Sequence, residues 1–323
     1  MQKIKKFLQD WRHLKIDKLY SIIYNNSWKI MAVKGGFFSK PTDEKSNIKK
    51  FYFMAGLPRS GSTLLSSLLN QNPRFYSGPS SPIVGLIQSI ENNLNTNELF
   101  IAYPKVQQAQ QIMSSVIHQY YSDVLQPVVI DKNRAWTNHI DVITRYINQE
   151  PKIICPVRDI DEILTSMITM VRRNPYKEGQ PKINFVDEML VRSGILINDD
   201  NRCEMFAGPN GILGQSLKGI MDVIDNGMID NMHFVEYKDL TDNPQETMNK
   251  IYEFLGEEPY EHQFEGIGNV NRENDLNVYG IADMHEVRSK LEVTSPNPKD
   301  VLSEKTLSKC QGMDIWRQNN NNK

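Results

Sequence analysis

The chain has 323 residues, of which 39% are hydrophobic and 24% are charged, and its formal net charge is −2. This composition excludes a disordered protein and a disulfide-stapled miniprotein, and the length suits one compact domain with appendages. The near-neutral charge balance gives no sign of nucleic-acid binding, and no apolar run reaches the ~20 residues that a membrane span needs.

Residues 1–48 are predicted to be a basic N-terminal extension, because residues 1–50 carry 12 Lys and Arg against 4 Asp and Glu. Within residues 1–20 the apolar positions recur at helical spacing among lysines, which predicts a basic amphipathic helix. Such a helix could make a peripheral contact with an anionic membrane or bind a partner. The alternatives are that it packs on the protein's own core or is loosely ordered. The apolar positions are Ile4, Phe7, Leu8, Trp11 and Leu14.

A cytoplasmic location is predicted from two further features of the sequence. Asp10, Arg12 and His13 interrupt the place where the apolar core of a secretory signal would lie. The cysteines are odd in number and lack metal-ligand spacing, which fits a reducing compartment and gives no sign of a metal site. They are Cys155, Cys203 and Cys310, of which Cys155 is predicted to lie in a buried strand.

Residues 51–70, FYFMAGLPRSGSTLLSSLLN, read as an apolar strand, a tight turn and a helix. The first N–H groups of that helix lack intrahelical partners and lie at the positive end of its dipole, so an anion is the expected ligand. Gly56, Gly61 and Thr63 have the spacing of the nucleotide-triphosphate loop, but Ser62 stands where that loop has its lysine. The loop therefore predicts a ligand with a smaller anionic group, and Arg59 offers it a cation.

Three more strands are predicted near residues 128–130, 152–156 and 233–236, each leading into a helical pattern. Alternating strands and helices predict an α/β fold with a central parallel sheet flanked by helices. Ligands of such sheets bind at the carboxyl ends of the strands. The groups that follow these ends should therefore meet at one edge, and they include Arg59, Lys132, Arg158 and Tyr237. Residues 76–127 and 170–230 read mainly as helices and loops.

The P-R-S-G-[ST]-T turn after a strand resembles the 5′-phosphosulfate loop of sulfotransferases that use 3′-phosphoadenosine 5′-phosphosulfate (PAPS). Three later segments are similar to the same family in the same order: VVIDKNRAW at 128–136, KIICPVRDIDEILTSMI at 152–168, and HFVEYKDLTDNP at 233–244. The resemblance covers roughly residues 50–260. It implies a P-loop NTPase-like sulfotransferase fold of the bacterial or phage type, related to tyrosylprotein sulfotransferases, over residues 49–316.

The resemblance also implies roles for particular residues. Arg59 and Lys132 would hold the sulfuryl group, and Arg158 with Ser166 would clamp the 3′-phosphate of the donor. Tyr237 would lie near the adenine. The 5′-phosphosulfate would lie on the loop, which contributes Arg59, Ser60, Gly61, Ser62 and Thr63.

Residues 275–290 resemble the loop with which bacterial and phage relatives close over the nucleotide. Arg288 and Lys290 would then reach the donor phosphates, and His285 would reach the phosphates or the acceptor. The alternative is a solvated charged stretch. Residues 317–323 end in a polar asparagine run and are predicted to be a disordered tail.

The implied reaction is sulfuryl transfer from PAPS to a hydroxyl or amine acceptor, without a metal ion. The acceptor class is left open among small molecules, glycans, lipids and peptides, and the oligomeric state is not predicted. The general base cannot be carried over, because Arg134 stands where cytosolic relatives have a histidine and residues 77–81 lack the glutamate of the tyrosylprotein enzymes. Asp131, which adjoins Lys132, is our candidate for this catalytic role, and the alternatives are Glu91, His118, His139 and His285.

Two other classes of function remain open. The absent base would also fit a nucleotide-binding protein without transfer activity. The loop alone would fit a divergent P-loop kinase, although the missing lysine disfavours a nucleoside triphosphate.

Overall fold

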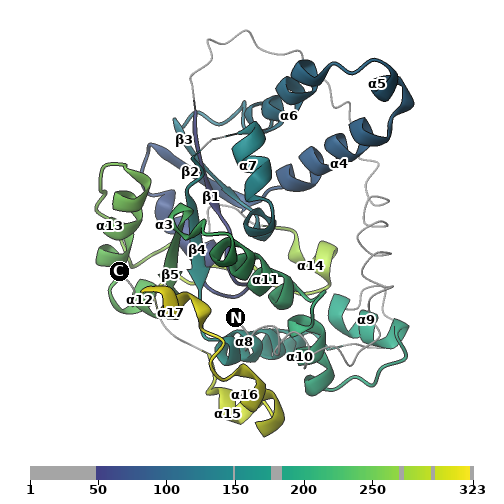
Figure 1. Cartoon of the computed structure of the whole chain (residues 1–323). Helices are drawn as coiled ribbons and strands as arrows, with labels where there is room; N and C mark the ends of the chain where they lie inside the picture. Colours follow the sequence, from purple (N-terminus) through teal and green to yellow (C-terminus); the bar gives the residue numbers. More distant parts are fainter. Residues whose placement is uncertain (1–48, 148–149, 176–183, 269–272, 292–294, 321–323) are drawn as a thin grey trace.

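The computed structural model describes residues 49–147, 150–175, 184–268, 273–291 and 295–320. Within these ranges five strands form one all-parallel sheet in the order β2-β3-β1-β4-β5, and helices cover both faces (Figure 1). This arrangement confirms the predicted α/β fold. The strands are β1 (Lys50–Met54), β2 (Phe75–Ser80), β3 (Val128–Lys132), β4 (Ile153–Val157) and β5 (Met232–Glu236).

Helices α3 to η3 lie between successive strands in the sequence, and helices α12 to α17 follow the last strand. The first group is α3 (Ser62–Leu69), α4 (Ile83–Thr96), α5 (Glu98–Ala102), α6 (Val106–Tyr120), η2 (Arg134–Asn138), α7 (Ile140–Tyr146), α8 (Ile160–Arg173), α9 (Phe185–Arg192) and α10 (Asp199–Ala207). The second group is α11 (Ile212–Asp225), η3 (Ile229–Asn231), α12 (Tyr237–Asp242), α13 (Pro244–Leu255), α14 (Asp275–Tyr279), α15 (Pro298–Val301), α16 (Glu304–Cys310) and α17 (Ile315–Asn320).

The central strand β1 is buried on both faces, because successive side chains of a strand point to opposite sides of the sheet. Phe51 and Phe53 pack into the larger core under α6, α8 and α11. Tyr52 and Met54 pack into the smaller core under α3 and α13. The near-continuous apolar run of this strand is thus explained by its central place in the sheet.

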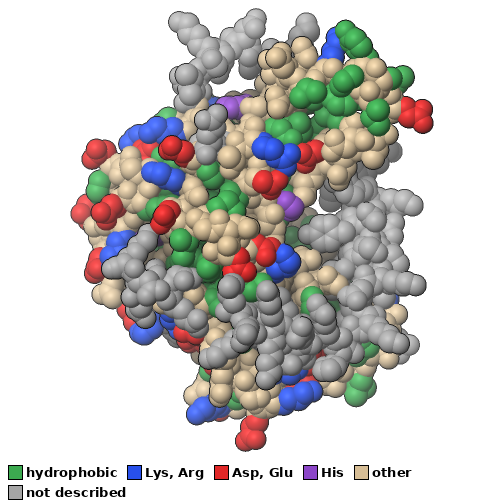
Figure 2. Space-filling model, in the orientation of Figure 1, with side chains coloured by type: hydrophobic (Ala, Val, Ile, Leu, Met, Phe, Trp, Pro, Cys, Tyr) green, Lys and Arg blue, Asp and Glu red, His purple; other side chains and the backbone are tan. Residues whose placement is uncertain are grey.

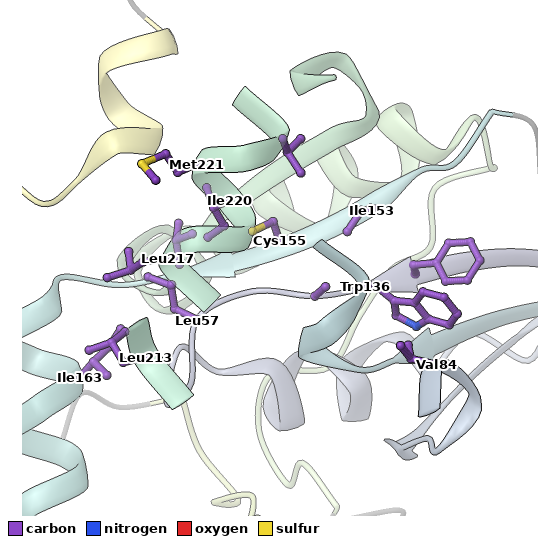
Figure 3. Close-up of a cluster of buried hydrophobic side chains, with 14 of the residues drawn as sticks. Leu57, Val84, Trp136, Ile153, Cys155, Ile163, Leu213, Leu217, Ile220 and Met221 are labelled. Carbon is purple, nitrogen blue, oxygen red and sulfur yellow. The ribbon is translucent and has the colours of Figure 1, made fainter. Parts of the chain in front are cut away.

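The larger core reaches from β4 to α11, as Figure 3 shows for part of the cluster. Trp136 is fully buried and packs edge-on against Phe53, with ring centroids 4.9 Å apart. Cys155 is also fully buried in this core, and burial raises the pKa of its thiol well above the usual value. Cys155 is therefore a packing residue, as the sequence predicted.

Strand β2 is a difference from the sequence prediction, which read the region after residue 76 as helices and loops. Its sequence, FYSGPS, contains Gly78 and Pro79, and proline cannot donate to a sheet ladder. The strand tolerates both residues because it lies at the edge of the sheet and its register shifts between Ser77 and Ser80. Edge strands with a bulge carry a weak sequence signal.

The ends of the predicted domain division fall partly outside the described residues. Residues 1–48, with their predicted amphipathic helix, lie outside them, as do residues 321–323. Helix α17 runs to Asn320, so residues 317–320 are helical where the sequence predicted a disordered tail. Arg317 holds this helix to the sheet through ion pairs with Glu236 and Asp159 at 2.7 Å each. The divisions at residues 48 and 316 stay predictions.

The face of the molecule in Figure 2 carries mixed charges and an apolar prominence. Helix α5 buries no residue, and apolar side chains gather over it and the adjoining end of α6 (Figure 2). Among the described residues, no helix is long and apolar enough to cross a membrane. The most exposed apolar side chains of the prominence are Leu99, Ile101, Tyr103 and Val106.

Candidate active site

A cavity of about 850 Å³ lies at the carboxyl edge of the sheet. Residues that follow four strands line it. Three of the four side chains that the sequence predicted to meet at this edge are among them, Arg59, Arg158 and Tyr237, whereas Lys132 is not. The loop after β1 contributes Arg59, β3 is followed by Asn133, β4 by Arg158, and β5 by Tyr237. Ser80 at the end of β2 also lines it.

The loop after β1 needs glycine at two positions for different reasons. A Cβ atom on Gly56 would lie 2.1 Å from the carbonyl oxygen of Pro156, so the loop can approach β4 only without a side chain there. Gly61 has φ +87° and caps the N-terminus of α3 in a left-handed conformation that disfavours other residues. A Cβ on Gly61 would also lie 2.7 Å from the ring of Tyr237.

Ser60 and the hydroxyl residues after it have different surroundings. The Ser60 hydroxyl is buried and bonds the carbonyl oxygens of Leu57 and Pro156, at 2.5 and 2.9 Å. It therefore fixes the loop and does not line the cavity. Ser62 and Thr63, in the first turn of α3, do line it.

Arg59 lies in the cavity with its backbone at φ +57°, a conformation that is rare outside glycine. Its Nε donates to Ser166 Oγ at 3.2 Å and its NH1 donates to the carbonyl oxygen of Met284 at 2.5 Å. Burial lowers the pKa of Arg59, and the nearby Arg158 lowers it further. Two guanidinium groups this close favour an anion between or beside them.

Arg158 is the first residue after β4, just before α8 begins, and it is 5% exposed. Its guanidinium donates to Glu162 at 2.8 Å, to Ser295 Oγ at 2.9 Å and to the carbonyl oxygen of Arg59 at 3.3 Å. The structure thus brings together Arg59 from the loop after β1, Arg158 from just after β4 and Ser166 from α8. Arg288 and Lys290 line the same cavity with exposed side chains.

Asp131 and Lys132 lie on β3 and their side chains have different surroundings. Asp131 is fully buried and accepts hydrogen bonds from Ser81, Tyr121 and Trp136 at 2.8, 2.7 and 2.6 Å. Burial raises the pKa of Asp131. The structure does not bring Asp131 to the cavity, because its carboxylate is a core anchor for three donors.

Lys132 is 6% exposed and does not line the cavity, and its Nζ is 3.6 Å from Glu273 Oε1. Burial lowers the pKa of Lys132, whereas Glu273 raises it. A nearby anion therefore favours the charged form of this ammonium group. Glu273 has no spacing signal in the sequence that links it to Lys132.

The segment before and after α14 forms a cluster that the sequence predicted only in part. His285 lines the cavity, and its Nδ1 lies 2.6 Å from Asp275 Oδ1 and 3.3 Å from Glu273 Oε2. The backbone N–H of His285 donates to the other oxygen of Asp275 at 2.8 Å. The sequence pointed to His285, but not to the two carboxylates that hold it.

The remaining base candidates do not line the cavity. Glu91 pairs with Arg145 at 2.5 Å and accepts from Tyr146 at 2.8 Å. His118 is exposed on α6, where its ring packs edge-on against Phe51. His139 bonds the Gln88 amide before α7.

One side of the cavity is an apolar wall near the C-terminal end of α8. Phe185 lies 6.4 Å from both Phe206 and Tyr279, measured between ring centroids. Tyr279 in turn lies 6.2 Å from the His285 ring in an edge-on arrangement. The wall is completed by Met167, Met170 and Ile212. The cavity therefore joins a cationic region to an apolar one.

Comparisons with known proteins give a consistent result. The sulfotransferase domain family matches residues 50–313. Protein-tyrosine sulfotransferase A of Caenorhabditis elegans is 22% identical over 216 residues, which are 66% of this chain and 51% of that protein. The chain thus spans about half the length of this curated relative.

Comparison with solved structures found sulfotransferase domains, including the two that follow. A sulfotransferase domain from the curacin biosynthetic pathway has 14% identity and a TM-score of 0.45, with 84% of this chain and 99% of that chain covered. A sulfotransferase domain from the olefin synthase of Synechococcus PCC 7002 has 17% identity and a TM-score of 0.42, with 84% and 98% covered.

Proposed function

The chain belongs to the sulfotransferase domain family, and on that premise we propose that it moves a sulfuryl group from PAPS to a hydroxyl or amine acceptor. The products are the sulfated acceptor and 3′-phosphoadenosine 5′-phosphate (PAP). The observation that carries the proposal is the convergence of Arg59, Arg158 and Ser166 on one cavity beside the N-terminus of α3.

The residues of the loop fit a 5′-phosphosulfate. The first turn of α3 presents backbone N–H groups at the positive end of the helix dipole, and glycine at position 61 keeps that end open. Ser62 and Thr63 add hydroxyl groups to the same end. The serine at position 62 leaves no lysine for a γ-phosphate, which supports a sulfuryl donor over a nucleoside triphosphate.

The residues around α8 fit the 3′-phosphate and adenine of the donor. Arg158 and Ser166 offer a guanidinium and a hydroxyl on the side of the cavity formed by α8, and guanidinium groups suit phosphate because of their planar donor geometry. Tyr237 offers its ring to the adenine, and its own neighbour is Arg158. Arg288 and Lys290 supply further positive charge at the cavity rim.

Sulfuryl transfer depends on stabilisation of the charge that develops in the transition state more than on a covalent intermediate with the protein. Negative charge develops on the oxygen that bridges sulfur and the departing phosphate, and fixed cations and N–H donors stabilise it. Arg59 lines the cavity beside the amides of the loop, and we assign both to this task. Lys132, paired with Glu273, would contribute its charge when Glu273 releases it.

The apolar wall supports an acceptor whose reacting group is carried on an apolar body. Three aromatic rings and two methionines of this wall line the cavity. Burying such a body contributes roughly 25 cal/mol per Å² of apolar surface. We therefore propose a phenol or another apolar alcohol in preference to an unsubstituted sugar.

Calorimetry without added metal tests the donor site. The wild-type protein should bind PAP at micromolar concentration or tighter and in preference to ATP. Arg158→Ala should weaken this binding, and Arg172→Ala is the matched control, because Arg172 lies on α8 outside the cavity and pairs with Asp199. Binding of ATP only with Mg²⁺ would favour a kinase, and PAP binding without turnover of PAPS would leave a binding protein.

A further inference from the structure

We propose that His285, held by Asp275, is the general base that removes the proton from the acceptor. The inference rests on the proposed sulfuryl transfer and supplies the group that the sequence could not identify. It depends on three relationships. Asp275 bonds His285, His285 lies next to the loop after β1 (residues 55–61, the donor loop), and the His285 ring contacts the apolar wall.

Asp275 fixes both the backbone and the ring of His285. It is 6% exposed, and its two carboxylate oxygens separately take the His285 backbone N–H at 2.8 Å and the ring Nδ1 at 2.6 Å. A carboxylate is acceptor-only, so the ring must donate through Nδ1–H. The lone pair of the neutral imidazole is then on Nε2, which is the nitrogen that can accept a proton.

The donor loop lies on one side of His285. The residue before it, Met284, accepts a hydrogen bond through its carbonyl oxygen from Arg59. On the other side, Glu273 bridges His285 to Lys132, with separations of 3.3 and 3.6 Å. His285 thus directly follows the residue that Arg59 contacts, and it is linked to Lys132 through the side chain of Glu273. Arg59 and Lys132 are the two cations assigned to the sulfuryl group.

The acceptor wall lies on the remaining side of His285. The Ala282 backbone N–H donates to the side chain of Asn174 at 3.1 Å, and Asn174 is the residue that caps the C-terminus of α8. From there the chain runs to Met284 beside Arg59, so residues 282–285 lead from the wall to the donor loop. The ring of Tyr279 on that wall faces His285 edge-on. An acceptor packed on the wall would therefore present its hydroxyl to His285.

The neighbouring carboxylate, Glu273, is a weaker candidate for this role. Its Oε1 is paired with Lys132 and lies 3.4 Å from the backbone N–H of Ser80. One carboxylate oxygen each of Glu273 and Asp275 and a ring nitrogen of His285 lie within 4.8 Å of one another, a spacing that could also hold a metal ion. The Lys132 ammonium group next to Glu273 opposes a second cation there, so the observations favour the base.

The step balances without any further reactant. The acceptor oxygen forms a bond to sulfur while the bond from sulfur to the bridging oxygen breaks, and that electron pair stays on the departing 5′-phosphate. The acceptor proton moves to Nε2 of His285, and the resulting imidazolium stays paired with the Asp275 carboxylate. A well-placed base of this kind contributes about 10²–10⁴ in rate.

Charged groups from four parts of the chain line the cavity with His285, pair with its ring or contact its carboxylate partners. A pH profile of turnover is therefore interpreted only by comparison with variants. The groups are Glu273 and Asp275 around α14, Lys132 and Arg134 near β3, Arg59 in the loop, and Glu286 and Arg288 on the segment of His285 itself.

The main test compares acceptors that differ in their need for a base. PAP release from PAPS is measured slightly above neutral pH with 2-naphthol, which is protonated there, with 4-nitrophenol, whose hydroxyl ionises near neutral pH, and with water alone. His285→Gln should lower kcat by ~100-fold or more with 2-naphthol and water, and by less than ~10-fold with 4-nitrophenol. A merely structural role would lower all three rates alike.

Two further variants complete the test. Asp275→Asn should lower kcat with little change in KM for PAPS, because Asp275 is a positioning residue that does not touch the donor. The acid limb of the kcat/KM profile should be present in the wild type and absent in His285→Gln. His118→Gln is the matched control and should leave rates and profile unchanged, since this exposed histidine lies outside the cavity.

The outcomes separate this inference from the function on which it rests. If His285→Gln retains the wild-type turnover with every acceptor, His285 is not the general base, and the proposed transferase function still stands. Turnover that EDTA abolishes and Zn²⁺ restores would also overturn the base, in favour of a metal ion at the same three residues. Tight PAP binding by a wild type that never consumes PAPS would overturn the proposed function and the base together.

Discussion

The guanidinium of Arg158 lies over the ring of Tyr237, with its central carbon 4.5 Å from the ring centroid. The two residues directly follow neighbouring strands, β4 and β5, so the parallel pairing of those strands brings them together. The ring also limits the side chain of residue 61, because any Cβ there would clash with it. One aromatic residue thus connects the donor loop to the arginine after β4.

Replacing Arg158 should remove recognition of the 3′-phosphate. Charged hydrogen bonds contribute roughly 1.5–3 kcal/mol each, so Arg158→Ala should weaken PAP binding by about 10- to 150-fold. Ser166→Ala loses one hydrogen bond to the same charged phosphate and should weaken PAP binding by about 10-fold, the lower end of that range. Calorimetry with PAP and with adenosine 5′-phosphate checks this. Equal losses for both nucleotides would contradict the assignment of Arg158 to the 3′-phosphate.

Replacing Arg59 should affect turnover more than binding. Its guanidinium is placed where charge develops on the departing phosphate, and such groups act mainly in the transition state. Arg59→Ala should lower kcat by ~100-fold or more and change the Kd for PAP by less than ~10-fold. Steady-state kinetics with PAPS and calorimetry with PAP measure the two effects. A loss confined to binding would mean that Arg59 only anchors the nucleotide.

The glycine at position 61 can be tested against two other glycines. Gly61→Ala should destabilise the fold by about 1–2 kcal/mol through its positive φ and also abolish PAP binding, because the added methyl group meets Tyr237. Gly227→Ala has positive φ in open space and should cost only stability. Gly85→Ala, in α4 with open space around it, should stabilise by about 0.5–1 kcal/mol. Thermal unfolding and calorimetry separate the three cases.

Asp131 should prove to be a core residue whose carboxylate is not needed for chemistry. Asp131→Ala leaves the buried donors of Ser81, Tyr121 and Trp136 unsatisfied, at about 1–3 kcal/mol each. Asp131→Asn keeps the shape and one acceptor oxygen, so kcat should stay within ~3-fold of wild type. An inactive but equally stable Asp131→Asn would restore Asp131 as the base that the sequence suggested.

The same substitution should change how stability depends on pH. Burial raises the folded-state pKa of Asp131 above its unfolded value. The stability that its protonated form contributes is therefore fully present below the unfolded pKa and is lost as pH rises through the folded pKa. Asp131→Asn removes this contribution, so denaturant unfolding at a series of pH values should show a smaller loss of stability across that window than in wild type.

Some of this protein was determined by local sequence alone. The apolar run of β1, the glycines at 56 and 61 and the helix after them specify a strand, a turn and an anion-binding helix end without help from distant residues. Alternating strands and helices specify a parallel sheet, and parallel strands put Arg59, Arg158 and Tyr237 at one edge. These features follow from periodicity and turn chemistry, which act over a few residues.

The rest was decided by contacts between distant parts of the chain. Asp131 and Lys132 are adjacent on a strand and so face opposite sides, but only the packing of β3 against β1, β2 and the helices determines which side meets the core. The link from Glu273 to Lys132 depends on a late segment folding over the end of β3. Asp275 and His285 lie ten residues apart on that same segment, and the link from Glu273 to Lys132 connects them to the sheet. No local pattern encodes a pairing across more than a hundred residues, because it exists only once the sheet has placed both partners.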